Sequence, residues 1–137
     1  MEIKNLLIEA IGVFLLTFSL GINFEVQKQS SSNVQSTQVG IAYMLVYICL
    51  FSLYNITPHL NPMITLTLFM LKKINLVYFL AYILTQFISG IFAALYLKVF
   101  LSGNVNPVET PELSIVQFFI LEIITCSLFV MTYLRAQ

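Results

Sequence analysis

Charged residues are scarce in this sequence. Of its 137 residues, 9% are Asp, Glu, Lys or Arg, whereas 59% are hydrophobic and the mean hydropathy is +0.94. A soluble domain has about 25% charged and about 45–50% apolar residues, so a soluble globule of this size could not bury so much apolar surface. The composition therefore excludes an ordinary soluble enzyme, and the hydrophobicity excludes a disordered chain. We predict a membrane protein built only of α-helices.

Residues that would support chemistry or charged partners are also few. Six basic residues balance six acidic ones, so no net field would attract nucleic acid. Cys49 and Cys126 each lie in an apolar run, which argues against a disulfide framework or a zinc site. A membrane enzyme or ion carrier that uses Glu9, His59 and Glu122 lacks support, because the chain has one histidine, no metal-ligand spacing and no nucleophile beside a base. We expect no enzymatic activity, no metal and no cofactor.

Four apolar runs have about the length that crosses a lipid bilayer. A helix needs roughly 20 mostly apolar residues, within a range of about 17–25, to cross a hydrocarbon core of about 30 Å. The runs are residues 6–22, 39–54, 76–97 and 113–134, of which the second is slightly short. No small-residue cleavage site follows the first run, so we interpret it as a retained helix rather than a signal peptide.

The basic residues predict the orientation of these spans. With both termini on one side of the bilayer, that side holds most of the Lys and Arg residues. The residues on this side are Lys4, Lys72, Lys73 and Arg135, and those on the other side are Lys28 and Lys98. Because Lys and Arg are enriched in cytoplasmic loops, we predict a multi-pass membrane protein with both termini in the cytoplasm.

Residues 55–73 break the pattern of spans. Their sequence is NITPHLNPMITLTLFMLKK, in which the apolar part is too short to cross a membrane. Asn61 is a favourable N-cap, and Pro62 would then occupy the first helical position, where its missing N–H costs nothing. We therefore predict a re-entrant loop and half-helix over residues 55–72, with free backbone N–H groups near the membrane midplane. An interfacial helix that follows an Asn-Pro turn, with no pore, is the alternative.

Two carboxylates, Glu9 and Glu122, lie inside predicted spans. A charge at this depth is expensive and normally faces a partner inside the bundle. The free N–H groups of the unwound loop are the expected partners. A proton or cation site is the alternative for both residues, and Glu9 could also reach the headgroups. The segments EAIGVFL and EIITCSL share Glu, Ile and Leu at equal spacing, which suggests that the fourth span begins a second copy of a repeat.

Four segments together resemble the N-terminal part of an aquaporin, of the major intrinsic protein family. They are EAIGVFLLTF, HLNPMITLTL, YFLAYILTQFISGIFAALYL and LEIIT, in the order and spacing of that family. The resemblance implies an aquaporin-like fold of inverted repeats, in which two half-helices bring paired Asn-Pro-Ala motifs together in a pore for water or small neutral solutes. It also implies a possible tetramer in the lipid bilayer. This chain would supply four transmembrane helices and one half-helix.

The resemblance also assigns roles to individual residues. Asn61, Pro62 and Met63 match the first pore motif, and Met63 replaces the usual alanine with a longer side chain, which would narrow the pore or shift its selectivity. The implied pore-lining residues are His59 and Ile41. The glutamates that hold the motif loops would be Glu9 and Glu122. Positions of close helix packing would be Gln86 and Gly90.

The resemblance places residues 1–112 in the first repeat and residues 113–137 in the first helix of an incomplete second repeat. The rest of the family pattern would lie beyond Gln137, including the second motif and most of the selectivity filter. We therefore expect a passive channel for water or small neutral solutes that does not conduct as this chain alone. The alternative is a non-conducting interaction or regulatory subunit that associates with full-length relatives. Osmotic permeability separates the two.

Overall fold

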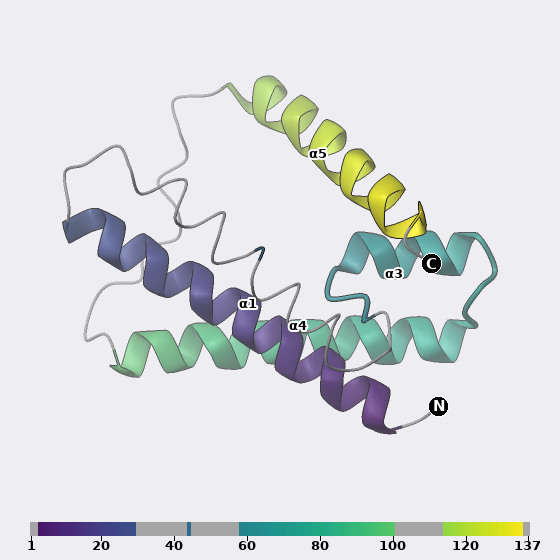
Figure 1. The fold of residues 1–137 in the computed structure, drawn as a ribbon, viewed down its shortest axis with the longest axis horizontal. Helices are drawn as coiled ribbons and strands as arrows, with labels where there is room; N and C mark the ends of the chain where they lie inside the picture. Colours follow the sequence, from purple (N-terminus) through teal and green to yellow (C-terminus); the bar gives the residue numbers. More distant parts are fainter. Residues whose placement is uncertain (1–2, 30–43, 45–57, 101–113, 136–137) are drawn as a thin grey trace.

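A computed structural model describes residues 3–29, 44, 58–100 and 114–135. In these ranges the chain forms helices α1 (Ile3–Gln29), α3 (Pro62–Met70), α4 (Leu76–Phe100) and α5 (Ile115–Arg135), and no strand (Figure 1). The prediction of an all-α membrane protein is confirmed. The predicted span 39–54 lies outside the described residues except for Met44, and the start of the loop at residues 55–57 lies outside them as well.

Three of the described helices are long and apolar enough to cross a membrane. These segments are Ile3–Asn23, Leu76–Phe100 and Ile115–Arg135. They contain the predicted runs 6–22 and 76–97 and nearly all of 113–134. Such helices satisfy every backbone hydrogen bond internally, which the hydrocarbon core requires. The chain is therefore a multi-pass membrane protein in contact with lipid.

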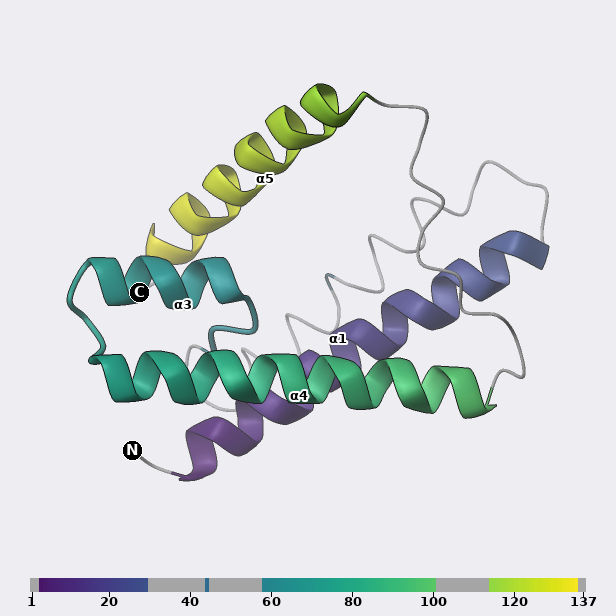
Figure 2. The ribbon, with the colours of Figure 1, turned by 180° about the vertical axis from the view of Figure 1, so that it is seen from behind.

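Helices α1 and α4 form the main pair of the fold, and they cross each other while running in a similar direction (Figures 1 and 2). Phe18 of α1 meets Tyr96 of α4 edge to face, with ring centroids 5.4 Å apart. Nearer the end of the pair, the Leu97 side chain fills the space that a Cβ on Gly21 would take. A small residue thus lets the two helices approach closely, as is common between membrane helices.

Helix α3 is the short element that the sequence predicts. Its nine residues span about 14 Å, less than half of the hydrocarbon core. It runs antiparallel to α4, and stacked rings of Phe69 and Phe79, with centroids 4.8 Å apart, join the two helices. Ile64 and Leu68 of α3 pack with Tyr133 of α5 in a small buried cluster. The chain therefore reverses its direction between α3 and α4, and the end of α3 lies beside the start of α4.

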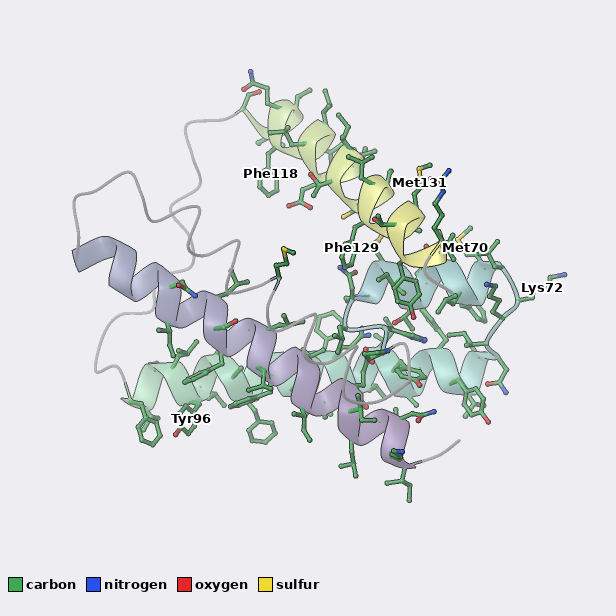
Figure 3. All side chains as sticks on the ribbon, viewed as in Figure 1. Met70, Lys72, Tyr96, Phe118, Phe129 and Met131 are labelled. Carbon is green, nitrogen blue, oxygen red and sulfur yellow. The ribbon has the colours of Figure 1, made fainter. Side chains whose placement is uncertain are left out.

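Much of the apolar surface of α4 and α5 is exposed in the single chain. On α5, 48% of Phe118 and 62% of Met131 is accessible (Figure 3). Large exposed apolar surfaces of membrane-length helices are satisfied by lipid or by another polypeptide. Helix α5 contacts the rest of the described chain mainly through its C-terminal half, at Phe129, Val130, Tyr133 and Leu134.

Candidate functional site

The site is built around the start of α3. Asn61 has extended backbone angles (φ −151°, ψ 129°), and its Oδ1 accepts a hydrogen bond of 2.7 Å from the backbone N–H of Met63. Pro62 occupies the first turn of the helix. Both features confirm the helix start that the sequence predicts. Because Oδ1 is used by the cap, the Asn61 amide nitrogen keeps its hydrogens for another acceptor.

The loop before Asn61 is held by the carboxylate of Glu9, which comes from α1. Glu9 is fully buried, with 0% of its surface accessible. Its Oε2 accepts from the backbone N–H of His59 at 2.9 Å, and its Oε1 accepts from the backbone N–H of Leu60 at 2.5 Å. Leu60 has a positive φ of 54°, a conformation that costs a residue with a Cβ roughly 1–2 kcal/mol. Two consecutive N–H groups thus converge on one carboxylate, and the strained backbone of Leu60 follows directly after them.

Gln86 of α4 extends this network across the bundle. Its Nε2 donates to Glu9 Oε1 at 2.6 Å and to Thr65 Oγ1 at 3.0 Å. All three side chains are buried. Glu9 therefore accepts three hydrogen bonds from the described residues, which offset the cost of burying its charge. The carboxylate does not reach the headgroups, which was one alternative for Glu9.

His59 contacts this network through Thr65. Only 7% of its surface is accessible, and its ring stacks on Tyr82 with centroids 4.2 Å apart. Its Nδ1 lies 3.1 Å from Thr65 Oγ1, and that hydroxyl also lies 3.1 Å from the carbonyl oxygen of Asn61. A hydroxyl has one hydrogen and two lone pairs. If the hydrogen goes to Asn61, the lone pairs receive Gln86 and His59, which favours the histidine tautomer that carries its proton on Nδ1.

Thr65 and Tyr82 are absent from the residues that the sequence analysis singles out. Thr65 does carry a local signal, because it follows Asn61 by four residues and therefore lies on the same helix face one turn later. Tyr82 carries no such signal. It lies in an apolar helix with other tyrosines, and only the packing of α4 against the loop brings it to His59.

The structure does not bring Glu122 to this network. Glu122 lies exposed on α5, where the thiol of Cys126 donates to it, with Sγ 3.8 Å from Oε2. Ile41 lies outside the described residues. Met63 follows Pro62 with 43% of its surface exposed. The functional roles of these residues stay predictions.

Gly90 faces open space rather than a neighbouring helix. A Cβ built on Gly90 meets no atom within 4 Å, so the close helix packing implied by the resemblance is not made there by the described residues. The close approach occurs at Gly21 instead, because the crossing of α1 and α4 brings Leu97 against that position. Gly90 lines a groove of about 410 Å³ beside the start of α3. The other lining residues are Val13, Thr17, Leu60, Pro62, Gln86, Phe87, Ile91 and Ala94.

The whole chain matches one known family. A family model described as Major intrinsic protein matches residues 1–137. No curated protein and no solved structure matches the chain significantly. The match includes the short half-helix, its Asn-Pro start and the membrane-length helices around it. The chain therefore belongs to the major intrinsic protein family, whose members are membrane channels for water or small solutes rather than enzymes.

Proposed function

We propose that this chain forms one wall of a passive pathway for water or small neutral solutes, with the start of α3 at its centre. The observation that carries the proposal is the anchoring of residues 59 and 60 by Glu9, since it holds the start of a half-helix inside the bundle. The Asn61 amide nitrogen would donate a hydrogen bond to the oxygen of a passing solute. Pro62 and Met63 would complete the motif, and Met63 would narrow the pathway.

The same geometry disfavours cations. A helix carries roughly half a positive charge at its N-terminus, and this end of α3 borders the groove that Pro62 lines. A cation near Asn61 would lose its hydration shell and be repelled by this positive field. A neutral solute would lose little hydration free energy and would not be repelled. The solutes are therefore water and small uncharged molecules.

The other sites complete the proposal. His59 and Ile41 would line the pathway, and Glu9 would fix the loop through its three hydrogen bonds. Glu122 would hold the corresponding loop of a second repeat that begins at residue 113, after a first repeat over residues 1–112. Gln86 and Gly90 would face a second half-helix that fills the groove beside Pro62 and closes the pathway.

Osmotic permeability tests this proposal. The chain is reconstituted into liposomes, alone or with a full-length family member, and shrinkage is followed after an osmotic step. We expect little conduction by the chain alone, because within the part of the chain that the structure describes the groove leaves the pathway open on one side. Any conduction that the chain does support should fall in N61A. It should persist in N75A, because Asn75 is exposed at the start of α4, where its Oδ1 accepts from the backbone N–H of Tyr78. Equal losses in both variants would contradict the role of Asn61.

A non-conducting interaction subunit is the second candidate. The groove favours it, because a pathway open at Pro62 and Gly90 offers a surface to another polypeptide of the same family. In that case the chain should co-purify with the full-length member and change its permeability without conducting alone. For the channel proposal, uptake of glycerol as well as water by the liposomes would show that the conducted solutes include small neutral molecules other than water.

A further inference from the structure

The turn between α3 and α4 places a lysine where the backbone favours glycine. Lys72 has φ 57°; its N–H donates to the carbonyl of Phe69, and the N–H of Lys73 donates to that of Leu68, both at 2.9 Å. This pair of hydrogen bonds is the Schellman ending of a helix, in which glycine is the usual residue at the left-handed position. Lys72 therefore places a side chain at the turn position where a glycine backbone would be less strained.

Lys72 is exposed, projects outward from the turn and is one of the residues that line a recess (Figure 3). This recess of about 650 Å³ at the α3–α4 turn is lined by Lys72, Lys73, Asn75 and Tyr78, among others. The remaining lining residues are apolar: Phe69, Met70 and Ile74. Apolar residues continue along the outside of α4 from this point, with 55% of Leu76 and 68% of Val77 exposed. The recess thus combines two lysines with a neighbouring apolar surface that suits an acyl chain.

The surrounding charge has one sign among the described side chains. The α3–α4 turn, the start of α1 and the end of α5 lie at the same end of the bundle (Figures 1–3). The charged side chains described at this end are Lys4, Lys72, Lys73 and Arg135. Glu9 is buried in the network of the α3 loop, and Glu122 lies in the N-terminal half of α5, away from this end of the bundle. The sequence predicts that this end is cytoplasmic, and a basic recess at the cytoplasmic end of membrane helices fits anionic lipid headgroups.

We propose that this recess binds the phosphate headgroup of an anionic phospholipid. Lys72 and Lys73 would contact the phosphate, Asn75 and Tyr78 would border the headgroup, and an acyl chain would follow Leu76 and Val77 down α4. The continuity of the recess with exposed apolar residues favours a lipid over free phosphate. The proposal does not depend on conduction, since it rests on the turn, on the basic side chains at this end of the helices and on the predicted orientation in the membrane.

Native mass spectrometry of the full chain in detergent micelles tests the site. We expect phosphatidylglycerol to be retained in preference to phosphatidylcholine. Loss of one lysine charge in K72Q should weaken retention about 5-fold, and K72Q/K73Q should weaken it roughly 25-fold. K98Q is the matched control, because it removes an exposed lysine from the opposite end of α4. Equal weakening by K98Q, or equal retention of phosphatidylcholine, would overturn the proposal.

Two further measurements separate binding from folding and from free anions. In K72G the side chain is lost but the left-handed turn is relaxed, so thermal stability should stay equal or rise while lipid retention falls about as in K72Q. Retention that is unchanged in K72G would overturn the role of Lys72. Inorganic phosphate that displaces the lipid completely at comparable concentration would show a free-anion site and overturn the assignment to lipid.

Discussion

Replacement of Glu9 by glutamine should loosen the loop before α3. A carboxylate presents two acceptor oxygens to His59, Leu60 and Gln86, whereas a glutamine presents one oxygen and one NH2 group. At least one buried N–H would face another donor. A hydrogen bond to a charged group contributes about 1.5–3 kcal/mol, and an unsatisfied buried donor costs about 1–3 kcal/mol. Relief of the buried charge offsets part of this loss.

The net loss is about 2–3 kcal/mol of local stability, which corresponds to roughly 30–150-fold easier opening of the loop. Amide hydrogen exchange of His59 and Leu60 in the reconstituted chain measures it, since exchange of these groups requires release from Glu9. Glu122→Gln is the matched control, because it removes a carboxylate that lies in a span but does not contact the loop in the described structure. Exchange that is unchanged in Glu9→Gln, or accelerated equally in Glu122→Gln, would contradict the anchoring of the loop by Glu9.

Two further predictions concern the histidine tautomer and the glycines. His59 is the only histidine of the chain, so 15N-histidine labelling reports on it alone; the proton should lie on Nδ1, and Thr65→Val should remove this preference. A proton on Nε2 in the parent chain would contradict the hydrogen-bond order through Thr65. Gly21→Ala should destabilise the fold by about 1 kcal/mol because Leu97 must move, whereas Gly90→Ala should be neutral or stabilising by up to about 1 kcal/mol. Unfolding in micelles compares the pair, and a greater loss in Gly90→Ala would contradict the open position of Gly90.

Local chemistry made much of the fold predictable. The apolar runs determine where the three long helices of the described residues lie, because a bilayer requires about 20 apolar residues in a row. Asn61 and Pro62 determine where α3 begins, because the cap and the ring constraint act within one turn. A buried glutamate in an apolar span indicates that a partner exists, but it does not name the partner.

The family resemblance allows a more specific assignment of function than the hydrophobic pattern of the sequence does. Composition and periodicity indicate a membrane protein with a half-helix, and the match over residues 1–137 shows which family contains that arrangement. The position of Gly90 illustrates the limit of this transfer. The resemblance implies a close helix contact there, and the described chain has a groove instead.

Neighbouring residues are enough to predict the membrane class, the long described helices and the capped start of α3, since each depends on local chemistry. Which polar groups meet depends on the tertiary structure. Gln86 reaches Glu9 across 77 positions of the chain and Thr65 across 21, and His59 stacks on Tyr82 from a different element. Among the described residues, the tertiary structure also decides that the close contact lies at Gly21. These pairings depend on how the helices cross and on the strained turn at Leu60, and neither is encoded by the residues on either side.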